Sequence, residues 1–303
     1  MFLTIFTPIY NREEYLIRLY NSIKEQRCSD FEWIIIDDGS TDNSYEKAKQ
    51  IQFQEKRIKI RVFKVKNGGK QRAINKAVKL ATGKYFFIVD SDDWLTPDAL
   101  IYVKKWCKEI ESLQNYNNYA GVSGLRISSK GKIRGGNGNG KEKIDCTNLD
   151  RDEYNLLGDK AEIYKTSILR RYPFKEFKNE NFITEETVWN EIATHGYIIR
   201  WHMVPIYISD YLDDGLTRNK IPRDIKNYKG LTFWVKQSIE LKKTKFIIAT
   251  VGYYALISKK KKISFKKMAQ NLNYPMELII AYYYIYIVYK KIKTKVKGDE
   301  YQS

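Results

Sequence analysis

The sequence has few of the residues that build disulfide scaffolds and side-chain metal cages. Its 303 residues include only three cysteines, Cys28, Cys107 and Cys146, which are widely spaced and form no C-x-x-C pair. That count excludes a disulfide-rich secreted fold and suits a protein of the reducing cytoplasm. There are two histidines, and neither His195 nor His202 sits in a cluster typical of metal ligands. We assign neither histidine to a metal site.

Long apolar runs are absent as well. The apolar run at 278–289 is shorter than the roughly 20 residues that a transmembrane helix needs. Residues 1–11, MFLTIFTPIYN, lack the basic and long apolar regions of a signal peptide and predict a first strand instead. We therefore expect a cytoplasmic protein that is not exported.

Arginine is missing from the last quarter of the chain, although the formal net charge is +18. Residues 229–303 hold 16 lysines, no arginine and four acidic residues, which accounts for +12 of that charge. Lysine without arginine is a poor match to the base-reading surfaces of nucleic-acid-binding proteins. The charge therefore favours an anionic membrane surface as a partner and argues against nucleic acid.

The first hundred residues show a regular alternation of strand-like and helix-like segments. Short runs rich in β-branched and aromatic residues alternate with helical patterns, which is typical of βαβ units and a mostly parallel sheet. The spacing of Asn11 and Glu14 matches a capping box, so we expect a helix to begin there. The predicted strands are 2–6, 31–36, 57–63 and 85–89.

Later segments are less regular. Residues 131–141, GKIRGGNGNGK, are rich in glycine and predict a mobile loop. We expect a helix around 184–196, then two paired strands at 197–203 and 205–211. The predicted organisation is an α/β domain at 1–223, with halves 1–114 and 115–223, and a basic helical extension at 224–303.

Three of the predicted strands end in polar clusters, TPIYN, DDGSTDNS and DSDD. In an open parallel sheet, ligands bind beyond the carboxyl ends of the strands. Asp90 and Asp92 would point to the same side of a continuing strand, where like charges repel unless a cation lies between them. Hard divalent cations take such oxygen ligands and often bridge them to substrate phosphates. A solvated turn is the alternative for DSDD alone, but three such strand ends favour a ligand site.

Four motifs together resemble the family 2 nucleotide-sugar glycosyltransferases of the GT-A fold. They are TPIYNREEYL, IDDGSTDNS, NGGKQRAINKAVKLATGKY and DSDDWLTPDAL, and their order and spacing carry the likeness. It continues more loosely through GDKAEIYKT, FITEETVWNEIATHGY and DDGLTRN to about residue 220. The resemblance implies a Rossmann-like GT-A fold, with a mostly parallel central sheet and flanking helices.

The resemblance also implies an activity. Such an enzyme transfers a sugar with inversion from a nucleotide-diphosphate sugar, here UDP-linked, to a hydroxyl of a glycan or lipid-linked acceptor, with Mn²⁺ or Mg²⁺ as cofactor. Arg200 and Trp201 match the end of the Q-x-x-R-W signature of processive members, but the glutamine and the following membrane spans are missing. We therefore expect a single transfer. In a chain that resembles this family, a composition rich in lysine, tyrosine and asparagine suggests bacterial surface polysaccharide biosynthesis.

Several positions match the donor-binding residues of that family. Thr7 and Tyr10 match the first-strand motif that lines the nucleotide pocket, and Asp38 matches the carboxylate that binds the uracil or ribose. Asp90 and Asp92 match the D-x-D motif, in which the last Asp holds the metal on the diphosphate.

Two further residues, Lys70 and Asp37, are expected to have other roles. Lys70 could meet the diphosphate as a point charge, and a solvated lysine is the alternative. Asp37 is expected to brace the turn after its strand.

The family's catalytic base is an Asp of an acidic pair on a helix behind the acceptor pocket. Glu186 stands at that position in this chain, preceded by Glu185, and an extra methylene separates Glu from the usual Asp. The alternative is that both are first-turn acids that the helix dipole favours. Glu186 is therefore the predicted base, and Glu185 is the second candidate.

The basic C-terminal segment leaves two interpretations open. Its lysines and tyrosines suit a helix lying in a membrane surface, so the enzyme would be peripheral on the inner face of the plasma membrane. A helix packed on the core with a solvated lysine face fits equally well. Two other functions are alternatives. A nucleotidyltransferase of related architecture should have a basic glycine-rich loop after the first strand. A non-enzymatic membrane-binding protein would leave the acidic motifs unexplained.

Overall fold

The computed structural model describes residues 1–210, 220–241 and 244–299. The chain divides into two units, Met1–Phe174 with Val188–Leu212, and Lys175–Thr187 with Asp213–Ser303. The predicted boundary between residues 223 and 224 does not coincide with this division. It falls inside helix α7 (Lys220–Lys226).

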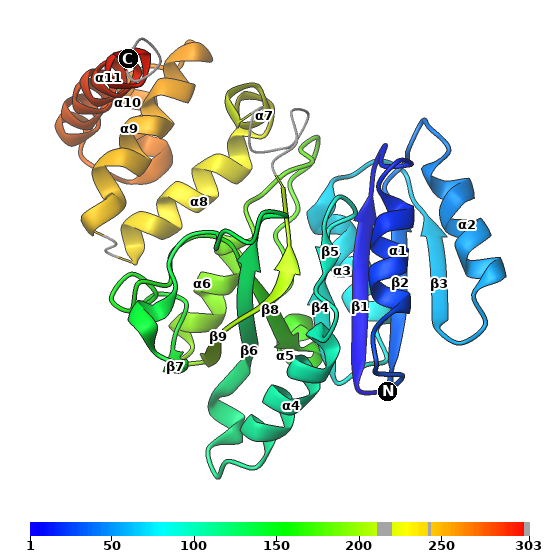
Figure 1. Ribbon diagram of the computed structural model, residues 1–303. Coiled ribbons are helices and arrows are strands. Elements are labelled where there is room, and N and C mark those ends of the chain that lie inside the picture. Colours follow the sequence, from blue (N-terminus) through cyan, green and yellow to red (C-terminus); the bar gives the residue numbers. More distant parts are fainter. Residues whose placement is uncertain (211–219, 242–243, 300–303) are drawn as a thin grey trace. The chain divides into compact units, whose positions relative to one another are not determined.

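Within the described part of the first unit, nine strands form one sheet (Figure 1). The path runs β3 (Lys59–Lys64), β2 (Phe31–Asp37), β1 (Leu3–Ile9), β4 (Tyr85–Ile88), β8 (Lys160–Lys165), β6 (Tyr119–Ile127), β9 (Ile198–Ile208) and β5 (Trp94–Leu95), and β7 (Lys143–Cys146) pairs with β9. The first four strands of the path run parallel, and β8 joins them antiparallel. The predicted α/β fold around a central parallel sheet is confirmed.

Helices flank this sheet because each carries an apolar stripe. In α1 the buried residues Leu16, Leu19 and Ile23 recur at helical spacing, and they pack in one cluster with Leu3 and Ile5 of β1. Burial of β1 on both faces is typical of a strand inside a parallel sheet. The helices before residue 195 are α1 (Leu16–Lys24), α2 (Ser44–Gln54), α3 (Lys70–Leu80), α4 (Ala99–Glu111), α5 (Thr166–Arg171) and α6 (Glu186–Thr194).

The capping box predicted at Asn11 and Glu14 is wrong. Helix α1 begins at Leu16, and the residue before it, Tyr15, makes no side-chain cap. Asn11 has a positive φ of 51°, and its Oδ1 accepts a hydrogen bond from the backbone N–H of Thr41 at 2.9 Å. Asn11 therefore joins the loops after β1 and β2 instead of starting a helix.

The glycine-rich segment 131–141 follows a defined path in the structure, where the sequence predicts a mobile loop. The backbone N–H of Gly136 donates to the carbonyl of Leu157 at 2.8 Å, and that of Gly138 donates to the carbonyl of Asn155 at 3.1 Å. A Cβ at Gly136 would lie 2.0 Å from the Asn155 carbonyl oxygen. Glycine at this position therefore permits close approach of two backbone segments.

The two paired strands predicted at 197–203 and 205–211 are one strand, β9, over the described residues. Pro205 has no N–H to donate and would be expected to interrupt a strand. It lies opposite Leu125 of β6, where the register between the two strands shifts on both sides. This irregularity lets β9 continue through the proline.

The second unit is helical and has its own apolar core. Val235, Val251, Tyr254, Met268 and Ile279 are buried in one cluster. Its helices after α7 are α8 (Tyr228–Glu240), α9 (Thr244–Lys260), α10 (Phe265–Leu272) and α11 (Met276–Asp299). None of the helices in the described ranges is both long enough and apolar enough to cross a bilayer.

The pairing of β6 with β8 depends on the absence of a side chain at Gly121. A Cβ there would lie 1.9 Å from the carbonyl oxygen of Ile163. Gly121→Ala should therefore lower the free energy of unfolding by about 3 kcal/mol, since backbone atoms must move apart. Gly131→Asn is the control, because Gly131 has open space and a φ of +79° that Asn tolerates. Equal urea midpoints for Gly121→Ala and the native chain would contradict this close approach.

Candidate functional site

The acidic cluster follows directly after β4, as the sequence predicts. The side chains of Asp90 and Asp92 are half-buried, and that of Asp93 is buried. The backbone N–H of Asp90 donates to the Tyr207 hydroxyl at 2.9 Å, and that hydroxyl donates to Asp93 Oδ2 at 2.8 Å. Tyr207 of β9 therefore fixes the chain at both ends of the cluster.

Cations from three separate segments face these carboxylates. Lys70 Nζ, at the start of α3, lies 2.6 Å from Asp90 Oδ1. Arg12 Nε, after β1, lies 3.8 Å from Asp92 Oδ2. Arg126 Nη1, at the end of β6, lies 3.8 Å from Asp93 Oδ2. The structure thus places Lys70 at the site, paired with a predicted site residue.

The three carboxyl groups differ in how well they are compensated. Although burial opposes ionisation, Lys70 and Arg126 hold the pKa of Asp90 below its usual value. Burial and the charge of Asp90 raise the pKa of Asp92, and the same two causes raise the pKa of Asp93. Burial and the charge of Asp90 therefore disfavour ionisation of Asp92 and Asp93, although Arg12 and Arg126 lie beside them, and a cation bound at Asp92 would relieve that repulsion.

Asp38 braces the turn that leads to Lys70. Its carboxylate oxygens accept hydrogen bonds from the backbone N–H groups of Gly68 at 2.8 Å and Gly69 at 2.7 Å. Burial raises the pKa of Asp38, despite these two bonds. Asp37 accepts from the backbone N–H of Ser40 at 3.2 Å, so it braces its own turn as expected.

The two predicted residues of the first-strand motif lie in different environments. Thr7 is fully buried, and its hydroxyl oxygen accepts a hydrogen bond from Trp33 Nε1 at 3.0 Å. Its side chain therefore stabilises the core of the sheet. Tyr10 is exposed at the end of β1.

Four residues of the site have no counterpart in the sequence-based prediction. Arg12 and Arg18 both reach Asp92, the latter through Nη2 to the Asp92 carbonyl at 2.5 Å. Arg18 also stacks on the Trp94 ring at 3.9 Å. Arg12 could have been noticed because it follows the TPIYN motif directly. Arg126 and Tyr207 follow the cluster by many residues, and no sequence signal marks either.

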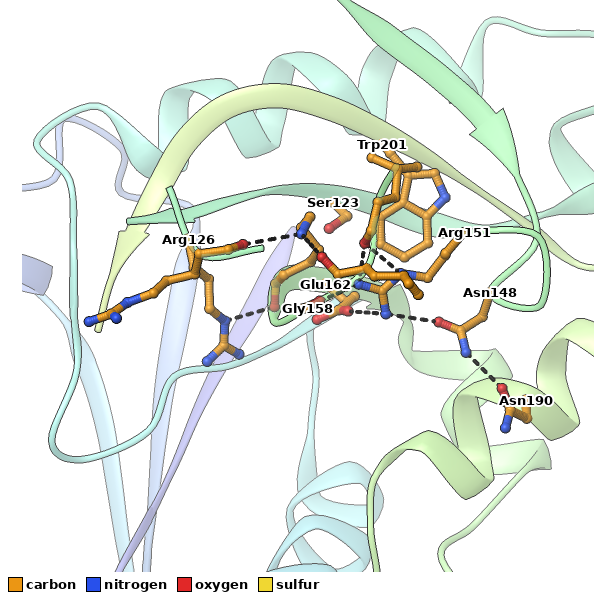
Figure 2. A network of polar contacts seen from close by, with 12 residues as sticks. Ser123, Arg126, Asn148, Arg151, Gly158, Glu162, Asn190 and Trp201 are labelled. Atoms are coloured by element: carbon orange, nitrogen blue, oxygen red, sulfur yellow. Dashed lines mark hydrogen bonds and ion pairs between the residues drawn. The ribbon is translucent and has the colours of Figure 1, made fainter. Parts of the chain in front are cut away.

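Arg126 also belongs to a polar network behind the site, which Figure 2 shows from close by. Its Nε donates to the carbonyl of Lys160 at 2.7 Å, and the fully buried Lys160 Nζ donates to the carbonyls of Leu157 and Arg134. Burial, with Arg151 nearby, lowers the pKa of Lys160 to about 8.

The far end of this network is centred on Arg151. Its Nη1 lies 3.9 Å from Glu162 Oε1, and Asn148 links it to Asn190 of α6 through a side-chain hydrogen bond of 2.8 Å (Figure 2). The Arg151 guanidinium also lies over the Trp201 ring at 4.8 Å. The two halves of the network therefore hold the segment at 134–160 against β6, β8 and α6.

The predicted acidic pair belongs to the second unit. Glu186 is the first residue of α6, as the helix-dipole alternative requires, and Glu185 precedes it. One carboxylate oxygen of Glu186 accepts a hydrogen bond from Trp234 Nε1 of α8 at 3.0 Å. Another acid that sequence reasoning missed, Glu180, accepts from the backbone N–H groups of Lys229 and Gly230. Glu180 therefore caps the start of α8.

Neither histidine has the surroundings of a metal ligand. His202 is buried and stacks on the Trp106 ring at 4.2 Å, and burial lowers its pKa to about 4. A ring nitrogen of His195 lies 2.8 Å from the Glu191 carbonyl oxygen. His202 is therefore neutral at physiological pH. Both histidines make contacts within the protein that stabilise its structure.

The carboxylate oxygens of the acidic cluster are of the ligand type that hard divalent cations take. Within residues 1–210, 220–241 and 244–299, no three His, Cys, Asp or Glu side chains come together as a metal-binding group. Asp92 therefore offers a single carboxylate, which Arg12 also faces at 3.8 Å. A hard cation held by one carboxylate takes its other ligands from phosphate and water.

The chain is similar to known glycosyltransferases in sequence. The model of the family described as Glycosyl transferase family 2 matches residues 4–176. Glycosyltransferase GlyG of Streptococcus pneumoniae is 32% identical over 120 residues, which is 39% of this chain and 40% of GlyG. The poly(ribitol-phosphate) beta-glucosyltransferase of Bacillus spizizenii is 30% identical over 129 residues, which is 42% of this chain and 20% of that protein. The matches thus span less than half the length of these relatives.

Solved structures share the fold. S. aureus TarS 1-349 in complex with UDP-GlcNAc has a TM-score of 0.62 at 17% identity, over 96% of this chain and 92% of that chain. The mannosyltransferase PcManGT from Pyrobaculum calidifontis, in complex with GDP-Man and Mn2+, has a TM-score of 0.56 at 16% identity, over 94% of this chain and 86% of that chain. The fold is GT-A.

The geometry predicts that the Tyr207 hydroxyl stabilises the acidic cluster. Tyr207→Phe removes the donor to Asp93 and the acceptor of the Asp90 N–H, so the free energy of unfolding should fall by about 2 kcal/mol. Tyr10→Phe, at an exposed position, should change it by less than about 0.5 kcal/mol. Urea unfolding of both variants measures the difference. Equal midpoints for the two variants would show that this hydroxyl is dispensable.

Proposed function

Because the chain belongs to glycosyl transferase family 2, we propose that it is an inverting, metal-dependent hexosyl- or hexosaminyltransferase. It transfers one sugar from a nucleotide-diphosphate sugar, UDP-linked, to a hydroxyl of a glycan or lipid-linked acceptor. The observation that carries the proposal is the acidic cluster after β4, with Lys70 and Arg12 beside Asp90 and Asp92. Carboxylates for a dication next to cations for phosphate oxygens suit a diphosphate.

At the donor end each residue has a proposed role. Asp92 holds Mn²⁺ or Mg²⁺, which neutralises the leaving diphosphate when bound. Asp90 orients Lys70, whose ammonium meets the diphosphate as a point charge. Tyr10 lines the nucleotide pocket, and Asp38 serves the uridine directly or through the turn that it braces.

Relatives support the choice of donor and pathway. The TarS structure holds UDP-GlcNAc, and the PcManGT structure holds a nucleotide sugar with Mn2+. The Bacillus spizizenii relative is named for glucosyl transfer to poly(ribitol phosphate). We extend from these names to bacterial surface polysaccharide biosynthesis as the setting of this chain.

At the acceptor end, Glu186 is the proposed general base. The acceptor hydroxyl oxygen bonds to the anomeric carbon as the bond from that carbon to the diphosphate breaks on the opposite face, and the hydroxyl proton passes to Glu186. Trp234 Nε1 engages one carboxylate oxygen of Glu186. This contact fixes the carboxylate orientation, so Glu186 is preferred to Glu185.

The proposal includes a location. The cysteines are free thiols, with Cys107 and Cys146 buried, as suits a reducing cytoplasm. The lysine-rich last quarter of the chain suits an anionic surface, so the enzyme is proposed to work at the inner face of the plasma membrane.

Asp92→Asn tests the metal assignment. The amide keeps the size of the side chain but removes a charged ligand, so Mn²⁺-dependent UDP binding should fall by about tenfold or more in calorimetry. Asp98→Asn is the matched control, because Asp98 is a half-buried acid that pairs with Arg27 directly before α4. If Asp92→Asn binds UDP with the same Mn²⁺ dependence as the native chain, Asp92 does not hold the metal.

Glu186→Gln separates chemistry from binding. The amide cannot take the proton, so transfer to an acceptor should fall roughly 10²-fold or more while UDP and metal binding stay unchanged. Glu185→Gln should retain near-native transfer. A dead Glu185→Gln beside an active Glu186→Gln would move the base by one residue, and activity in both would place it elsewhere.

Trp234→Phe completes that experiment, because it removes the Nε1 donor and keeps an aromatic ring, although a smaller one. It should lower kcat by about tenfold with little change in the KM for the donor. In the Glu186→Gln background it should have no further effect. Additive losses would show that Trp234 acts independently of Glu186.

A further inference from the structure

Over residues 276–292, whose side chains the structure describes, helix α11 has one apolar face that packs against its own unit and another that is exposed. Ile279 is fully buried, and Tyr282, Tyr283 and Tyr286 pack against the same core. A Cβ at Gly252 of α9 would lie 2.5 Å from the Tyr282 carbonyl oxygen, so the two helices cross closely. The tyrosine-rich face of α11 is therefore an internal packing face.

The opposite face of α11 carries a continuous row of exposed apolar side chains. Leu278, Ile285, Val288 and Ile292 are between 39% and 58% exposed, and their seven-, three- and four-residue steps place them on one side of the helix. Tyr284 and Tyr289 flank the row and are equally exposed. We call these six residues the α11 stripe. A contiguous exposed apolar row of this kind marks an interaction surface. Exposed apolar residues that are scattered singly carry no such meaning.

Charge next to the α11 stripe identifies the kind of partner. Lys290 and Lys291 are exposed at the end of the stripe, and Lys291 follows Val288 and Tyr284 at i+3 and i+7. Elsewhere in the same unit, exposed lysines occupy residues 259–262 and positions 266 and 267. A formal net charge of +18 opposes pairing with a second copy of the chain and attracts an anionic surface.

We propose that the α11 stripe docks on an anionic lipid surface. The apolar side chains enter the boundary between headgroups and acyl chains, the tyrosines lie at headgroup level, and the lysines contact lipid phosphates. The helix lies along the membrane plane. This surface is separate from the proposed transfer site, and its test requires no sugar transfer.

The test compares binding of the full chain to phosphatidylglycerol vesicles and to phosphatidylcholine vesicles by flotation. The native chain should float with the anionic vesicles at low salt, much less with the neutral ones, and high salt should release it. Replacing two stripe residues, Ile285→Glu with Val288→Glu, should weaken binding by more than about tenfold, because two apolar side chains that would be buried in the membrane are lost. Phe53→Glu, at the 77% exposed Phe53 of α2, is the control and should bind as the native chain does.

Two results would overturn the proposal. One is failure of the native chain to float with anionic vesicles at low salt. The other is a native dimer, seen by light scattering, that Ile285→Glu with Val288→Glu converts to monomer without changing vesicle binding, since the stripe would then face a second copy. UDP binding and thermal unfolding of the double variant should match the native chain, which separates a docking defect from a folding defect or a failure of the transfer site.

Discussion

Three carboxylates within four residues cannot all stay ionised in a half-buried place unless cations lie beside them. Asp90, Asp92 and Asp93 obtain those cations from three parts of the first unit, Lys70 on α3, Arg12 after β1 and Arg126 at the end of β6. Each cation arrives only when its own segment is folded. The pairing of these carboxylates with cations therefore ties the ends of β1, β4 and β6 to the start of α3.

The turn at 67–70 links Asp38, a proposed nucleotide-binding residue, to the position of Lys70. Asp38 accepts from two consecutive backbone N–H groups directly before Lys70, so it sets where α3 begins and where the lysine reaches Asp90. A loss of donor affinity on changing Asp38 would then have two physical sources, a lost contact to the nucleotide and a displaced Lys70. The displacement of Lys70 would also occur in the free protein, so it can be measured without ligand.

The parts of the fold that sequence predicted are those set by local pattern. The four parallel strands are short buried runs separated by helical stripes, and DSDD follows one of them directly, so all were found at nearly the right positions. The capping box failed because Asn11 has a partner thirty residues away, in a loop that no local pattern reveals. Arg126 and Tyr207 were missed for the same reason, since only the pairing of β6 and β9 brings them to the acidic cluster. The hydrogen bond between Thr7 and Trp33 likewise depends on the pairing of two strands and not on a local motif.

The second unit joins two properties that suit a membrane-bound acceptor. Helix α8 presents Trp234 to Glu186, and Leu231 and Val235 of the same helix pack in the core that also holds Ile279 of α11. The proposed base and the proposed lipid-docking stripe are therefore parts of one packed helical body. An acceptor anchored in the bilayer would meet the body that carries both, and docking would raise its local concentration without any contact specific to its lipid. On this argument the α11 stripe should matter for a lipid-linked acceptor and be irrelevant for a short soluble one, because only the former is confined to the surface on which the stripe rests.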